Sequence, residues 1–179
     1  PPSAATPPHQ ALDTITEWAS CGEVHPDHSR LITSSAPLMD VPSDPPAGAT
    51  SFDLRAPEYP VGPEVLDRYQ CFVFEAPIDG PRLARRFEMV LGDSRVLHHL
   101  VLYRDNDKES PPDDHVCFSV PSGSDFLYAW APGQDAFQFP EGGLRIEPGE
   151  RFLVQIHYNN GAAIEGVRDT SGVRVWHEP

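Results

Sequence analysis

From Ser51 to the end, the sequence is a series of short apolar runs separated by turns rich in proline and glycine. The chain contains 21 prolines and 13 glycines, and its second half shows no long helical periodicity. Many short strands with frequent turn signals are typical of a β-sandwich or barrel. The pattern therefore predicts an all-β domain with strands near 51–55, 69–75, 84–91, 96–103, 115–119, 126–131, 151–159 and 172–177.

The tripeptide Gly92-Asp93-Ser94 is a turn signal between two of these strands. Two strands joined by so short a connection usually pair with each other as a β-hairpin. We therefore expect strands 84–91 and 96–103 to be neighbours in one sheet.

Residues 1–50 have a different character from the rest of the chain. One amphipathic helix is expected near residues 9–20, and a proline-rich extended linker follows at 37–50. Such a segment has little apolar surface with which to offset its ordering entropy. We predict an N-terminal arm over 1–50, which becomes ordered against a partner surface, and a β domain over 51–179.

The chain is acidic, with 13 Lys and Arg against 27 Asp and Glu and a formal charge of −14. This balance argues against a nucleic acid partner, whose phosphates need cations. It fits a solvated surface or a docking face for a basic partner. No run of 18 apolar residues exists, so no transmembrane segment is predicted. No signal peptide is visible, and the opening PPSAATPP fits either a mature end or a linker after a removed segment.

Two adjacent histidines, His98 and His99, stand in the strand-like run VLHHLVLY, and His157 stands in FLVQIHYNN. Alternation along 151–159 puts His157 on one face together with Gln155, opposite the large apolar residues. Three imidazoles without a carboxylate or thiolate fit copper or zinc. His98 and His99 point to opposite faces of a flat strand, so both reach one ion only if a β-bulge or a strong twist redirects one of them.

The alternative for each of these histidines is a half-buried side chain with ordinary hydrogen bonds. The remaining five histidines have polar or terminal surroundings and are expected to be solvated: His9, His25, His28, His115 and His177.

The three cysteines, Cys21, Cys71 and Cys117, cannot all pair within the chain. Cys71 and Cys117 lie in strand-like runs, where a buried thiol and a disulfide fit equally well.

Six pieces of the sequence, in order, resemble the N-terminal domain of the copper type II, ascorbate-dependent monooxygenases. The pieces are SFDLRAPEYPV, DRYQCFVFEAP, VLHHLVLY, FLYAWAPGQDAFQFPEGG, FLVQIHYNN and TSGVRV. The resemblance implies a jelly-roll-like antiparallel β-sandwich. It also implies one copper ion per chain, with His98, His99 and His157 as its ligands.

The same resemblance implies roles for four further residues. Tyr69 and Gln155 match residues near this copper, where they would orient the imidazoles by hydrogen bonds, although Tyr69 also fits a core aromatic residue. Cys71 and Cys117 match a family disulfide, which implies an oxidising compartment and therefore a periplasmic or secreted protein. Thr170 stands where the family has a cysteine of a second disulfide.

The resemblance is incomplete at the C-terminal side. The family's oxygen-activating copper is held in a second domain by two histidines and a methionine, and neither Met39 nor Met89 stands in a matching context. We therefore expect an electron-transfer copper module without complete monooxygenase activity, serving a redox-protein partner. The alternatives are a non-catalytic accessory or structural subunit of a larger, membrane-bound redox complex, or a fragment of a complete copper monooxygenase that continues beyond Pro179.

Overall fold

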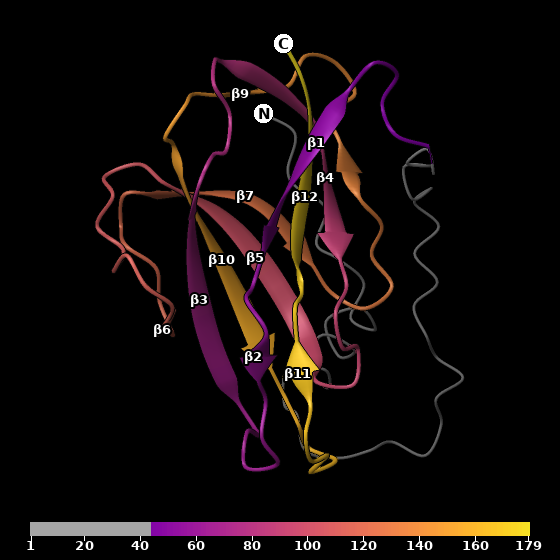
Figure 1. Ribbon diagram of the computed structural model, residues 1–179, viewed down its shortest axis with the longest axis vertical. Helices are drawn as coiled ribbons and strands as arrows, with labels where there is room; N and C mark the ends of the chain where they lie inside the picture. The colour runs from indigo at the N-terminus through magenta and orange to yellow at the C-terminus, as the bar shows by residue number, and fades with distance from the viewer. Residues whose placement is uncertain (1–43) are drawn as a thin grey trace, which may run out of the picture. The chain divides into compact units, whose positions relative to one another are not determined.

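The computed structural model describes residues 44–179, and this part of the chain is built from β-strands without a helix (Figure 1). No helix long and apolar enough to cross a membrane occurs among these residues. The expected helix near 9–20, Cys21, and most of the predicted arm lie outside the described residues. The arm and its boundary near residue 50 therefore stay predictions.

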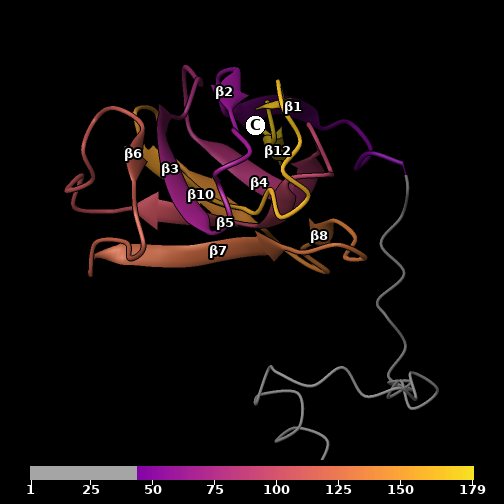
Figure 2. The same ribbon diagram turned by 90° about the horizontal axis from the view of Figure 1, so that it is seen from below.

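The strands form two antiparallel sheets of five strands each and one short pair. The first sheet has the order β1-β12-β4-β8, with β9 also paired to β4, and the second has the order β6-β3-β10-β5-β7. Figure 2 shows these sheets as two layers, which confirms the predicted sandwich. The strands are β1 (Thr50–Arg55), β2 (Tyr59–Pro60), β3 (Arg68–Glu75), β4 (Arg82–Val90), β5 (Leu97–Asp105), β6 (His115–Val116), β7 (Ser124–Trp130), β8 (Phe137–Gln138), β9 (Leu144–Ile146), β10 (Arg151–Tyr158), β11 (Arg168–Asp169) and β12 (Gly172–Glu178).

The core lies between the inner faces of the two layers. Strand β10 contributes Phe152, Val154, Ile156 and Tyr158, each fully buried, as the alternation predicted. They pack in one cluster with residues of the opposite sheet such as Leu54, Phe87, Val173 and Val175. Burial of large apolar side chains contributes about 1.5–3 kcal/mol each. The outer face of β10 is thereby left for Leu153, Gln155 and His157.

The predicted hairpin is wrong, because β4 and β5 belong to different sheets. The Gly92 N–H donates to Ser171 Oγ (2.9 Å) and the Asp93 N–H to Asp169 Oδ1 (2.8 Å). A Cβ atom at Gly92 would lie 2.4 Å from Asp169 Oδ1, so this close approach requires glycine. A turn is present at Gly92 as predicted, but it directs the chain from the sheet of β4 to the other sheet, which contains β5.

Each of the eight predicted strands corresponds to a strand of the structure, although β6 is shorter than expected. Four strands of two or three residues were missed, namely β2, β8, β9 and β11. Segments this short show no alternation that a pattern could detect.

The expectation that His177 is solvated is also wrong. Its side chain on β12 is 8% exposed, and its ring centroid lies 5.5 Å from that of Phe52. Burial, and secondarily the charge of Arg82, lower the pKa of His177.

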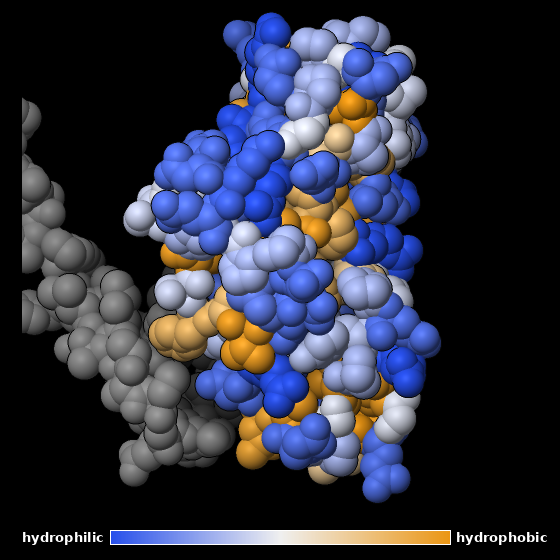
Figure 3. All heavy atoms as spheres, turned by 60° about the vertical axis from the view of Figure 1, so that its left-hand side comes forward, coloured by the Kyte–Doolittle hydropathy of each residue, from blue (hydrophilic) through white to orange (hydrophobic). Residues whose placement is uncertain are grey.

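The exposed large apolar residues of the described part are few and spread over several elements. On the face drawn in Figure 3, hydrophobic residues form small patches that are interrupted by hydrophilic ones. The exposed residues include Val116 and Phe118 at the edge strand β6 and Phe126 on β7.

Candidate metal centre

A β-bulge in strand β5 brings both adjacent histidines out of the core. His157 of β10 pairs with His99, and the next residue of β10, Tyr158, pairs with Leu97, so His98 has no partner in this ladder. An extra residue of this kind interrupts the alternation of side chains. Leu97 and Leu100, on either side of the two histidines, are therefore both buried in the core. The bulge that the sequence argument required is present.

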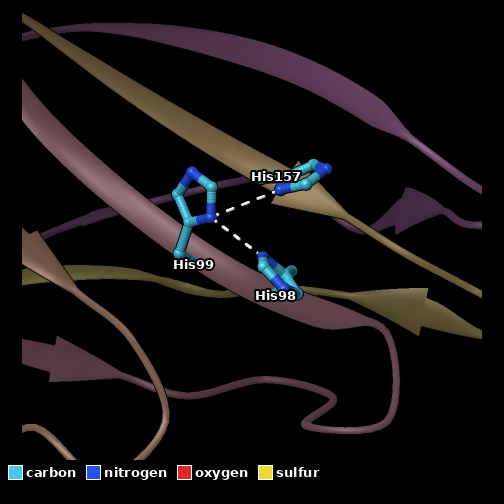
Figure 4. Close-up of side chains that lie close together, drawn as sticks. All are labelled: His98, His99 and His157. Atoms are coloured by element: carbon cyan, nitrogen blue, oxygen red, sulfur yellow. Dashed lines mark hydrogen bonds between the residues drawn. The ribbon is translucent and has the colours of Figure 1, made fainter. Parts of the chain in front are cut away.

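The three imidazoles converge at the bulge (Figure 4). The Nδ1 atom of His99 lies 3.0 Å from Nδ1 of His98 and 3.3 Å from Nδ1 of His157. The ring centroids are 4.7–5.3 Å apart, and the available ligand atoms lie within 4.8 Å of one another. His98 is exposed, His99 half-buried and His157 buried, so the cluster opens to solvent from one side.

The chemistry of this cluster fits a metal ion. A neutral imidazole has one N–H donor and one acceptor nitrogen. The Nδ1 atom of His99 faces two other Nδ1 atoms, and one N–H group cannot serve both of them well. A cation would accept a lone pair from each nitrogen. Nitrogen ligands alone suit copper and zinc better than calcium or magnesium.

The lowered pKa of His99 also favours metal binding at this cluster. Burial lowers the pKa of His99, and the neighbouring charges of His157 and His98 lower it further. Histidine must be neutral to bind a metal. His99 is therefore available as a ligand at a lower pH than an ordinary histidine.

Tyr69 lies at the cluster, and it contacts the imidazoles through its ring. It is the cross-strand partner of His157, and the two rings are stacked with centroids 4.2 Å apart and an interplanar angle of 5°. It also meets His99 edge-on at 5.9 Å. Tyr69 is half-buried, outside the apolar core.

Gln155 shares the outer face of β10 with His157, as expected, but its side chain turns to the disulfide. Its amide nitrogen donates to the carbonyl oxygen of Cys117 at 3.0 Å and lies 3.8 Å from Cys117 Sγ. The hydrogen bonds described for Gln155 thus hold the segment after β6, and none of them reaches an imidazole.

Cys71 of β3 and Cys117, directly after β6, form the predicted disulfide, with their Cα atoms 5.7 Å apart. Both cysteines are buried, and Leu153 packs against them in a second small apolar cluster. The bridge fixes the two-residue edge strand β6 to the sheet that carries the histidines.

Asp67 is a further residue at the site that no sequence pattern singled out, and its Oδ1 lies 2.5 Å from His157 Nε2. A lone acidic residue in a chain with 27 Asp and Glu carries no signal of its own. It also lies just before β3 begins at Arg68, so the alternation of side chains along the strand does not place it.

A hollow of about 450 Å³ adjoins the exposed flank of the cluster, next to His98 and His99. Trp130 and the turn 131–134 form its other wall. This turn is held by hydrogen bonds from the indole nitrogen to the Gln134 carbonyl (3.0 Å) and from the Ala131 N–H to Gln134 Oε1 (2.8 Å). The approach to two of the three imidazoles is thus open and bordered by an ordered apolar wall.

Deletion of His98 is expected to weaken copper binding while leaving the fold intact. Without this residue, Leu97 and His99 would continue the regular ladder opposite Tyr158 and His157, with Leu97 still in the core. The free energy of unfolding should therefore change little. Copper affinity, measured by competition titration, should fall by more than the roughly 10–100-fold typical of losing a residue outside the coordination sphere.

The control for this deletion is His98→Ala, which keeps the bulge and removes the imidazole. Both variants should lose affinity to a similar extent. Full copper affinity in the deletion variant would exclude His98 from the site.

Comparison with known proteins places this arrangement in a family. The profile of the copper type II ascorbate-dependent monooxygenase, N-terminal domain, matches residues 52–165. Similar relatives include dopamine beta-hydroxylase of Bos taurus (32% identical, covering 83% of this chain and 26% of that protein) and of Rattus norvegicus (31%, covering 73% and 23%). DBH-like monooxygenase protein 1 of Gallus gallus is 28% identical, covering 75% of this chain and 24% of that protein. The chain spans about a quarter of the length of these relatives.

Proposed function

This chain belongs to the copper type II, ascorbate-dependent monooxygenases, and we propose that its β-sandwich is an extracytoplasmic electron-transfer module with one copper ion at His98, His99 and His157. The observation that carries the proposal is the convergence of three Nδ1 atoms at a β-bulge. Copper bound there would alternate between Cu(I) and Cu(II) and so accept or release one electron.

The residues of the chain support this role in different ways. His99 and His157 come from two neighbouring strands whose inner faces are fixed in the core, so their backbones are rigidly placed. His98 stands on the bulge at the open side, next to the hollow walled by Trp130. This side offers a small reductant or a partner surface access to the cluster.

The disulfide supports the proposed extracytoplasmic compartment. A bridge such as Cys71–Cys117 persists in oxidising surroundings and is rare in the cytosol. We place the protein in the periplasm or outside the cell. Its formal charge of −14 favours a redox partner with a basic docking face.

A second candidate function is favoured by the extent of the match. The matching family profile describes an N-terminal domain, and the chain spans about a quarter of its relatives. On this alternative the chain is one part of a complete copper monooxygenase whose oxygen-activating site lies elsewhere. A non-catalytic accessory subunit is the third possibility, and it requires no copper.

The experiment that tests the proposal starts from the metal-free full chain. It is loaded with one equivalent of Cu(II), reduced with ascorbate in the absence of oxygen, and mixed with oxidised cytochrome c as an electron acceptor. We expect the Cu(II) signal in electron paramagnetic resonance to disappear with ascorbate and return with cytochrome c. Absence of copper binding would favour the accessory subunit, and a bound copper that does not cycle would refute electron transfer.

Copper binding is expected to weaken as the pH falls from about 7 to about 5. Each imidazole must lose its proton before it binds, from an unperturbed pKa near 6.5. Because burial lowers the pKa of His99, protons compete with the ion at this ligand only at a lower pH than at an ordinary histidine. Affinity measured across this range should fall steeply, whereas an unchanged affinity at pH 5 would contradict ligation by these histidines.

A further inference from the structure

Asp67 makes a contact that the family assignment does not explain. Its Oδ1 atom lies 2.5 Å from Nε2 of His157, the nitrogen on the far side of the ring from the cluster. Within the described residues, it is the one carboxylate in contact with any of the three imidazoles. This carboxylate either orients His157 or forms an ordinary surface ion pair with it.

The strand geometry places Asp67 and Tyr69 around the same ring. Tyr69 pairs with His157 across the ladder, and Asp67 lies two residues earlier, just before β3 begins at Arg68. The Tyr69 ring covers one face of the imidazole in a parallel stack. Asp67 takes the outer edge, and Nδ1 at the inner edge faces His99 at 3.3 Å. The His157 ring is thus held by Tyr69 on one face and by Asp67 at its outer edge.

The position of the proton on His157 follows from the chemistry of its partner. An ionised carboxylate only accepts hydrogen bonds, so Nε2 carries the proton that lies between the two groups. A neutral His157 then has its lone pair on Nδ1, directed toward the cluster. Carboxylate partners of this kind orient metal-binding histidines and increase their basicity as ligands.

We propose that Asp67 is a positioning residue that fixes His157 as the tautomer with its proton on Nε2, before any metal arrives. A consequence concerns the metal-free cluster. Because Nδ1 of His157 then has no proton, the hydrogen bond between His99 and His157 needs the proton on Nδ1 of His99. An ion bound at Nδ1 of His99 would require this proton to pass to water while Nε2 of His99 takes one up, so His99 would change tautomer and His157 would not. The part of this inference that concerns copper affinity rests on the proposed function.

The opposing interpretation is an ordinary surface ion pair. The Asp67 side chain is 72% exposed, and exposed pairs typically contribute little to stability. The two interpretations differ in what removal of Asp67 does to the imidazole, since a surface pair leaves the tautomer and the metal affinity as they were.

The first test is nitrogen-15 NMR of the metal-free full chain at neutral pH. We expect the shifts of His157 to show a protonated Nε2 and an unprotonated Nδ1, with an Nε2–H proton that exchanges slowly with water. In Asp67→Ala this proton should exchange rapidly, while Asp67→Asn, whose amide oxygen still accepts a hydrogen bond, should keep part of the protection. A proton on Nδ1 of His157 in the unaltered chain would overturn the proposal.

The second test is copper affinity by competition titration. Asp67→Ala should bind copper roughly 10–100-fold more weakly, with partial recovery in Asp67→Asn. The matched control is Asp113→Ala, which removes another exposed carboxylate, on the segment before β6, that has no hydrogen bond to His98, His99 or His157. Equal affinities of Asp67→Ala and Asp113→Ala would overturn the positioning role. If the unaltered chain binds no copper, the proposed function fails, and the NMR result still decides the tautomer.

Discussion

Replacement of His157 with alanine is expected to abolish tight copper binding. His157 is the buried member of the cluster, and it is the one ligand contributed by a second strand. Without it, two adjacent histidines of β5 remain on an open surface, and the ion loses its third nitrogen. The fall in affinity should exceed the roughly 10–100-fold that removal of a hydrogen-bonding neighbour typically causes. Competition titration with a chelator of known affinity measures it.

His115→Ala is the matched control for this variant. His115 lies on β6, and its Nδ1 contacts the carbonyl of Asp113, away from the cluster. Its removal should leave copper affinity unchanged. Thermal unfolding of His157→Ala is needed beside the titration, because the stack with Tyr69 is lost as well. A folded His157→Ala chain with full copper affinity would contradict the assignment of His157 as a ligand.

Replacement of both Cys71 and Cys117 with alanine is expected to lower the free energy of unfolding by about 2–5 kcal/mol. The two cysteines are 46 residues apart, and the loop-entropy model gives about 4 kcal/mol for a loop of this length. Both side chains are buried beside Leu153, so the variant also loses apolar contacts. Because Gln155 bonds to Cys117 through a backbone carbonyl, that hydrogen bond depends on the position of the bridged segment.

Urea denaturation of the oxidised chain and of the double variant provides the comparison. The oxidised chain treated with a reductant should unfold at nearly the same urea concentration as the double variant. A double variant as stable as the oxidised chain would show that the β6 segment is held without the bridge. The two substitutions should have only a small effect on copper affinity, since neither cysteine touches an imidazole.

The strands of the core were predictable because burial imposes a period of two on them. In β10, Phe152, Val154, Ile156 and Tyr158 show this period without interruption, and the structure places all four between the sheets. The partner of a strand was not predictable in the same way. The turn at Gly92 was recognised, yet its hydrogen bonds to Asp169 and Ser171, 76 or more residues later in the chain, carry the strand into the other sheet.

The histidines of the site were predictable, but their surroundings were only partly so. The bulge at His98 could be expected, because two adjacent histidines on one strand cannot otherwise reach one ion. Tyr69 lies at the cluster, whereas the buried Gln155 bonds to the carbonyl oxygen of Cys117, a partner 38 residues away in the sequence. Asp67 lies just before β3, and its contact depends on a cross-strand register that the sequence does not state.

The most direct test of the central claim is copper analysis combined with X-ray absorption spectroscopy of the full chain after loading and removal of excess metal. We expect one copper per chain, with a first shell of nitrogen ligands and the scattering pattern of imidazole rings. Reduction to Cu(I) should leave the three imidazoles in place. A chain that retains no copper, or whose copper is bound by sulfur or carboxylate oxygen, would contradict the site at His98, His99 and His157.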